Sequence, residues 1–93
     1  MIHKIIFMNS ALYIVGTPIG NLDDITSRAL KILNTVDIIA CEDTRHSKHL
    51  LSKFSINKKL ISFHQHNEKN KSQFLISEIQ NGKTIAYVLT RVL

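Results

Sequence analysis

The chain has 93 residues and a mass of 10.6 kDa, which suffices for one small domain and not for two. A composition of 44% hydrophobic and 20% charged residues, with a mean hydropathy of +0.03, excludes both a disordered acidic segment and a bundle of membrane helices. The single cysteine, Cys41, excludes an internal disulfide and a paired-cysteine metal site, and predicts a reducing, cytoplasmic location. Because Cys41 lies in an apolar run, we interpret it as a core residue.

The positive charge is concentrated in the second half of the chain. Residues 1–43 hold three basic and five acidic residues, a net charge of −2, whereas residues 44–93 hold nine basic and two acidic residues, a net charge of +7. Such a basic segment is compatible with binding a phosphate backbone. Lysines on solvated helix faces are the simpler explanation from charge alone.

Apolar runs and helically spaced apolar residues alternate along the chain. The sequence predicts, in order, a strand over 12–15, a glycine loop over 16–21, a helix from Asp23 or Asp24 to Asn34, a strand over 37–41, a helix from Asp43 or Thr44 to Phe54, a strand over 60–63, a helix over 72–80 ended by a left-handed Gly82, and a strand over 84–88. Residues 1–11 show no organised pattern and are interpreted as an N-terminal extension. Four strands alternating with three helices predict an α/β fold with a parallel sheet, flanking helices and right-handed crossovers.

Polar or glycine-rich segments follow three of the predicted strands. They are Gly16, Thr17, Pro18, Ile19, Gly20 and Asn21 after the first; Glu42, Asp43, Thr44 and Arg45 after the second; and His64, His66, Asn67 and Glu68 after the third. Ligands of open parallel sheets bind at the carboxyl ends of the strands, so the three segments together predict a binding site at one sheet edge. Each segment taken singly is equally well explained as a turn or a helix cap.

The spacing within these segments narrows the class of ligand. The G-x-x-x-G of residues 16–20, with its internal proline, matches neither the dinucleotide fingerprint nor a phosphate-binding loop, so we expect a ligand without a pyrophosphate. His46-x-x-His49 and His64-x-His66 have spacings found in metal sites, but no third ligand is evident and no metal is expected. Two interpretations of 42–45 stay open, an internal ion cluster and substrate positioning by the Arg45 guanidinium.

Segments 12–22, 24–30, 37–45 and 62–68 closely resemble the N-terminal part of the tetrapyrrole methylase family, in particular members that methylate ribosomal RNA. The most specific matches are Thr17-Pro18-Ile19-Gly20-Asn21-Leu22 and Glu42-Asp43-Thr44-Arg45, and the resemblance runs from Leu12 to about Val88. It implies the first domain of a two-domain fold whose cleft holds S-adenosylmethionine. It also implies methyl transfer to the 2′-hydroxyl of a cytidine in 16S rRNA of the small ribosomal subunit, a homodimer in full-length members and no membrane partner.

Carried over by position, the resemblance places 16–21 at the cleft, with Thr17 and Pro18 near the methyl donor or the target nucleotide. Glu42, Asp43, Thr44 and Arg45 lie beside them, and His64, His66, Asn67 and Glu68 lie at the neighbouring strand end. The transfer needs a group that takes the hydroxyl proton, for which Asp43 and Glu68 are the candidates. Two alternatives are a methylase of a corrinoid or other small molecule and a non-enzymatic RNA-binding module.

The chain departs from the family after the fourth strand. The family continues with Ser-Asp-Ala-Gly-Thr-Pro and a C-terminal domain, whereas residues 89–93 read Leu-Thr-Arg-Val-Leu. The nucleotides CTG ACG CGG GTA CTC encode these five residues, and the same string preceded by T and regrouped encodes Ser-Asp-Ala-Gly-Thr. We hypothesise that one lost base makes 89–93 an aberrant tail on a truncated domain of residues 12–88, which is inactive alone; sequencing the gene tests this.

Overall fold

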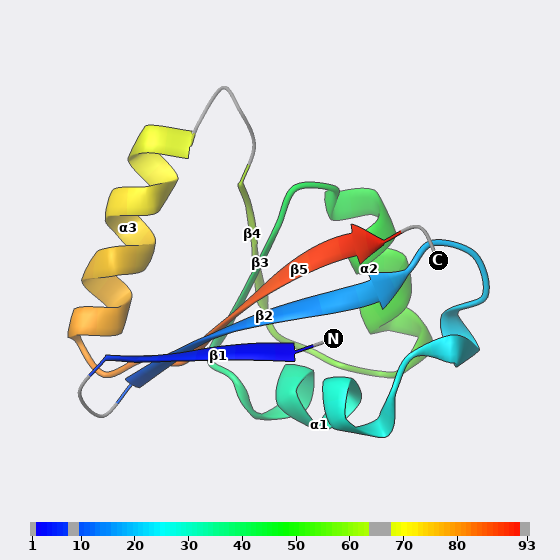
Figure 1. Ribbon diagram of the computed structural model, residues 1–93. Helices are drawn as coiled ribbons and strands as arrows, with labels where there is room; N and C mark the ends of the chain where they lie inside the picture. Colours follow the sequence, from blue (N-terminus) through cyan, green and yellow to red (C-terminus); the bar gives the residue numbers. More distant parts are fainter. Residues whose placement is uncertain (1, 8–9, 64–67, 92–93) are drawn as a thin grey trace.

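The computed structural model describes residues 2–7, 10–63 and 68–91, which form a five-stranded sheet in the order β1-β2-β5-β3-β4 (Figure 1). The strands are β1 (Ile2–Phe7), β2 (Ser10–Pro18), β3 (Ile38–Cys41), β4 (Lys59–Ser62) and β5 (Ile85–Arg91). The helices are α1 (Ser27–Thr35), α2 (Thr44–Lys53) and α3 (Glu68–Gln80), and a 3-10 turn, η1, spans Leu22–Asp24. None of the described helices is both long enough and apolar enough to cross a membrane.

Strands β2, β5, β3 and β4 are parallel to one another, which confirms the predicted α/β fold. Helices α1 and α2 pack on one face of the sheet, where their apolar residues join Val15, Ile39 and Val88 in one core cluster. Helix α3 packs on the other face through Leu75 and Ile79. The chain runs from β2 to β3 and β4 through α1 and α2, and it returns from β4 to β5 through α3. When all crossovers are right-handed, connections that run in opposite directions along a sheet lie on opposite faces, as they do here.

Strand β1 was not predicted. It pairs antiparallel with β2, from Ile2 opposite Val15 to Phe7 opposite Ser10. Residues 2–7, which lie in the segment interpreted from the sequence as an N-terminal extension, therefore form an edge strand of the sheet. The segment Ile-His-Lys-Ile-Ile-Phe has two polar residues followed by three apolar ones, so it lacks the period-two alternation by which a strand is predicted. The strand forms through backbone pairing along the edge of β2.

Strands β2 and β5 are longer than predicted. Gly16, Thr17 and Pro18, which were expected in a loop, are strand residues because 89–91 provide a parallel partner, with Thr17 opposite Thr90 and Pro18 opposite Arg91. Beyond them, Ile19 and Gly20 form a bend. Because a ladder is made by backbone groups, this pairing is compatible with either amino-acid sequence at 89–91, and the reading-frame hypothesis stays a prediction.

The first helix begins later than predicted. Asp23 and Asp24 lie in η1, and the N-cap of α1 is Thr26, whose hydroxyl accepts a hydrogen bond from the amide of Ala29 at 3.0 Å. This start turns Ala29, Ile32 and Leu33 toward the sheet while Leu22 is buried beneath the turn. The cap of the helix is therefore Thr26, and not Asp23 or Asp24 as predicted. The two aspartates instead belong to the turn that buries Leu22.

The other helix ends follow the sequence more closely. Asp43 is the N-cap of α2, as one of the two predictions had it. Helix α3 starts at Glu68, four residues before the predicted start. Gly82 has a φ of +85°, and the amides of Gly82 and Lys83 donate to the carbonyls of Ile79 and Glu78. This pair of hydrogen bonds is typical of a left-handed glycine cap, as predicted.

Asp37 joins the amino ends of β3 and β5. Its carboxylate accepts hydrogen bonds from the amide and the hydroxyl of Thr84, at 2.8 and 3.0 Å, and its own amide donates to the Thr84 carbonyl at 3.0 Å. The hydrogen bond from the Thr84 amide lowers the pKa of Asp37, and the positive charges of Lys83 and Lys58 act in the same direction. Asp37 therefore has a structural role at the edge of the sheet opposite to the predicted site.

Candidate functional site

The four parallel strands are aligned at the level where β3 and β4 end, and β2 and β5 continue three residues further. Val15 of β2 and Cys41 of β3 both pair with Val88 of β5, and Cys41 also pairs with Ser62 of β4. The residues that follow on the four strands are therefore next to one another, and they are Gly16, Leu89, Glu42 and Phe63. The amide of Phe63 donates to the Cys41 carbonyl at 2.7 Å, which continues the ladder beyond β4.

This register places two of the three predicted polar segments, 16–21 and 42–45, at one edge of the sheet. The third segment follows Phe63. Its residues His64, His66 and Asn67 lie outside the described residues, and Glu68 is the first residue of α3.

The connections after β3 and β4 leave the sheet on opposite sides. The chain after β3 enters α2 on one face, and the chain after β4 leads to α3 on the other (Figure 1). In open α/β sheets, ligands bind at the point where neighbouring strands connect to opposite faces. By this rule, the end of the sheet between Glu42 and Phe63 is the candidate position for a ligand.

The segment from Gly16 to Asn21 divides into a buried anchor and an exposed bend. Thr17 is 2% exposed, and its hydroxyl donates to the carbonyl of Leu89 at 3.2 Å. Ile19 is 49% exposed, and a Cβ added to Gly20 would meet no atom within 4 Å. The Asn21 side chain accepts from the amide of Asp23 at 3.0 Å and caps η1. The open backbone of the bend is thus the part that a ligand can reach.

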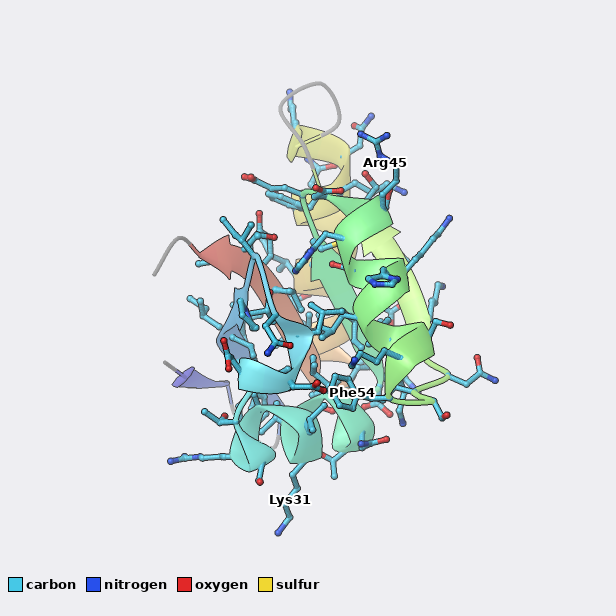
Figure 2. The ribbon with its side chains drawn as sticks, turned by 90° about the vertical axis from the view of Figure 1, so that its right-hand side faces the viewer. Lys31, Arg45 and Phe54 are labelled. Atoms are coloured by element: carbon cyan, nitrogen blue, oxygen red, sulfur yellow. The ribbon has the colours of Figure 1, made fainter. Side chains whose placement is uncertain are left out.

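The segment from Glu42 to Arg45 combines a helix cap with two exposed charges. One carboxylate oxygen of Asp43 accepts from the amides of Arg45 and His46, at 3.1 and 3.2 Å. Glu42 and Arg45 are exposed, and neither has an ion pair with another described residue. Figure 2 shows Arg45 extending outward from the first turn of α2. An internal ion cluster is therefore not what the structure contains, and both charges are available to a ligand.

His46 contacts Thr17, the buried residue of the glycine segment, although the sequence analysis had considered His46 only within a metal-site spacing that it rejected. Its Nε2 lies 3.4 Å from the Thr17 hydroxyl oxygen. A carbonyl oxygen can only accept, so the single hydroxyl proton of Thr17 points to Leu89, and the His46 ring donates its Nε2–H to Thr17. In the neutral ring Nδ1 is then the acceptor. No spacing in the sequence relates residues 17 and 46, so this contact follows only from the fold.

Ser47 lies behind this contact, beneath the first turn of α2. Its side chain is 1% exposed, and among the described residues its hydroxyl makes no hydrogen bond of regular geometry, although it interacts with the Cys41 thiol and acts to lower that thiol's pKa. It lies near Cys41, which is also 1% exposed; burial, followed by the negative charge of Asp43, raises the pKa of this thiol. The prediction that Cys41 is a core residue is confirmed. Among the described residues, no three potential ligands come together to hold a metal.

Comparison with known proteins identifies the family of the chain. The family model for tetrapyrrole (corrin/porphyrin) methylases matches residues 11–90. The chain belongs to the tetrapyrrole methylase family. Both the resemblance and the α/β fold expected from it are thereby confirmed.

Several curated methylases of this family are similar to the chain. The ribosomal RNA small subunit methyltransferase I of Escherichia coli is 56% identical over 77 residues, which are 83% of this chain and 27% of the relative. The proteins of the same name from Mycoplasmopsis pulmonis and Buchnera aphidicola are each 54% identical, over 83% and 88% of this chain and 35% and 29% of the relatives. The chain thus spans about a third of the length of these methylases.

Proposed function

We propose that the chain forms one wall of the active site of an S-adenosylmethionine-dependent methyltransferase that acts on 16S rRNA in the small ribosomal subunit. The observation that carries this proposal is an identity of 49% to 56%, over at least 83% of the chain, with relatives named ribosomal RNA small subunit methyltransferase I. The target that we propose, from the resemblance, is the 2′-hydroxyl of a cytidine.

The exposed residues at the sheet edge fit the methyl donor chemically. S-adenosylmethionine supplies an electrophilic methyl group on a sulfonium, and its other end is an amino acid with one positive and one negative group. Glu42 and Arg45 offer the opposite charges three residues apart, and the bend at Gly20 offers open backbone groups. We propose that these residues hold the donor, while the Thr17 anchor fixes the strand end from which the bend begins.

Transfer to a ribose hydroxyl also requires the chain to align that hydroxyl and to take up its proton. Asp43 and Glu68 remain the proposed acceptors. One oxygen of Asp43 is used by the helix cap, so only its second oxygen is available for this purpose. Glu68 begins α3, on the other side of the point where the strand connections diverge.

The proposal also covers the second wall of the active site, the oligomeric state and the location of the enzyme. The chain spans 27% to 35% of the relatives' length, and we propose that the rest of the relatives' fold supplies the opposite wall, so that these 93 residues alone transfer no methyl group. We also propose a homodimer for the two-domain enzyme and a cytoplasmic location, where ribosomal subunits are found.

A chimera tests the function directly. Residues 12–88 replace the matching segment of the Escherichia coli relative, and the chimera is incubated with radiolabelled S-adenosylmethionine and small subunits that lack the modification. We expect label in 16S rRNA from the chimera and none from the 93-residue chain. A folded chimera that binds the donor and leaves the rRNA unlabelled would contradict the proposed substrate. Label in 16S rRNA from the chain alone would contradict the proposed division of the active site.

The family name also covers methylases of corrins and porphyrins, which are small molecules. Against that alternative stands the agreement of the relatives' names, which all refer to ribosomal RNA. Activity of the chimera on a corrinoid and not on small subunits is the result that would favour it.

A further inference from the structure

The outer face of α2 is a continuous basic stripe. Its exposed residues are Arg45, Lys48, His49, Ser52 and Lys53. Their residue numbers increase in steps of three, one, three and one, which is the spacing that aligns side chains along one face of a helix. Three of the five are cations, and the ten residues of α2 include no aspartate or glutamate. The stripe therefore presents only positive or polar groups.

Most of this charge is not neutralised within the fold. Lys53, at the far end of the helix, forms an ion pair of 3.4 Å with Asp23. Arg45, Lys48 and His49 have no ion pair among the described residues. Helix α1 also carries two exposed cations, Arg28 and Lys31, and neither has an ion pair among the described residues. The part of the stripe from Arg45 to Ser52 thus carries two cations without an internal ion pair, and it begins directly after the sheet edge, where Glu42 and Asp43 precede it.

The composition of the stripe favours a polyphosphate over a membrane. A helix that lies on a membrane needs exposed apolar side chains beside its cations. The apolar residues of α2, Leu50 and Leu51, are buried in the core, and the large exposed apolar residues of the described chain are Ile19 and Ile76, neither of which is on α2. Sugar–phosphate backbones are bound by such cations and hydroxyls without apolar contact.

The position of the stripe connects it to the candidate site. Arg45 stands at the amino end of α2, directly after the sheet edge, and the stripe runs from there along the helix (Figure 2). At about 1.5 Å per residue, the span from Arg45 to Ser52 covers about 10 Å, enough for more than one phosphate group. A strand of nucleic acid bound on this face is therefore directed toward Glu42 and the bend at Gly20.

We propose that the exposed face of α2, formed by Arg45, Lys48, His49 and Ser52, binds the backbone of the RNA substrate and leads it to the sheet edge. This rests on the proposed function, because it takes the substrate to be ribosomal RNA. It adds to that function a named surface on this chain, which shares Arg45 with the segments that hold the donor and otherwise lies outside them.

One matched pair of variants tests the stripe. Lys48→Glu reverses a charge in the middle of the stripe, and Lys31→Glu makes the same change at an exposed position of α1, which points away from α2 (Figure 2). Binding of 16S rRNA to the 93-residue chain is measured by filter retention between 50 and 300 mM salt, with circular dichroism to compare folding. We expect Lys48→Glu to weaken binding about fivefold to tenfold at 0.1 M salt and to reduce the salt slope by about one, because one phosphate contact is lost.

Lys31→Glu should retain the wild-type salt slope, since no phosphate contacts α1. Equal weakening by the two variants, or no binding by the wild-type chain, would overturn the proposed stripe. Equally strong binding of polyglutamate would assign the stripe to acidic proteins and would also overturn it. These outcomes are independent of methyl transfer by the chimera, so the stripe and the proposed function can fail separately.

Discussion

At the scale of single residues, Thr17 decides how the end of β2 is held. Its hydroxyl connects three elements, because it donates to Leu89 of β5 and accepts from His46 of α2. The side chain is almost completely buried, so water does not replace either bond. A buried hydroxyl that bonds two partners stabilises one arrangement of the strand end, and the exposed bend then starts from a fixed position.

Thr17→Val keeps the shape of the side chain and removes both hydrogen bonds. We expect it to lower the free energy of unfolding by about 1–3 kcal/mol, because the carbonyl and the imidazole lose a buried partner. Urea unfolding measures this loss. Thr90→Val is the control, since Thr90 lies opposite Thr17 in register and is exposed.

The same variant tests the tautomer of His46. In the wild type, nitrogen NMR at a pH where the ring is neutral should show the proton on Nε2 and an unprotonated Nδ1. In Thr17→Val this preference should weaken. A wild-type ring with its proton on Nδ1 would show that the assigned direction of the hydrogen bond is wrong.

At the scale of elements, the clamp between Asp37 and Thr84 joins β3 to β5. The lowered pKa of Asp37 means that its contribution to stability is complete above the ordinary carboxyl pKa of 3.8 and is lost as the pH falls through the lower folded value. We expect Asp37→Asn to lower Tm by a few degrees at pH 7. The loss in the free energy of unfolding should be less than about 1 kcal/mol, because water screens the exposed carboxylate.

The difference between Asp37→Asn and wild type should shrink as the pH is lowered below about 4. Asp24→Asn is the matched control, because Asp24 is exposed, has the same charge and makes no side-chain hydrogen bond to a described residue. Melting curves of the three proteins at several pH values measure the effect. A gap between Asp37→Asn and wild type that persists at low pH would indicate that packing, and not the charge, stabilises the clamp.

The elements also show what the sequence can predict. Strand β3 and helix α2 were predicted nearly to their ends, because a fully buried apolar run and a capping aspartate are local signals. Strand β4, of which only Ile61 is buried, was predicted to within one residue at each end. The ends of β2 and β5 were missed because they depend on pairing with distant residues, as Thr17 with Thr90. Strand β1 was missed although its partner β2 is the next strand in the chain, because its own segment has no period-two alternation. In the site, polar segments after strands were visible in the sequence. The contact between Thr17 and His46 was not, since the two residues are 29 positions apart.

At the scale of the whole molecule, the two faces of the sheet are covered unequally. Helices α1 and α2 bury one face, where Val15, Leu33 and Leu50 are fully inaccessible. On the other face, α3 is the one described helix, and the aromatic residues Phe63 and Tyr87, which pack edge to face at 5.4 Å, stay partly exposed. Strand β1 covers the edge of β2, which reduces the open edge that a parallel sheet alone would leave.

This unequal cover predicts weak cooperativity and self-association of the isolated chain. Ile76 on α3 is 55% exposed, and exposed apolar surface of this kind promotes contact between copies. A cooperative domain of this length would unfold with an enthalpy of about 65 kcal/mol. We expect a broader melt with a smaller van't Hoff enthalpy, and a sedimentation coefficient that rises with protein concentration. Ile76→Glu should reduce the association. Ile19→Glu, which changes the other large exposed apolar residue of the described chain, should not. A sharp melt from a protein that stays monomeric at all concentrations would contradict this, because it would mean that α3 alone covers its face sufficiently.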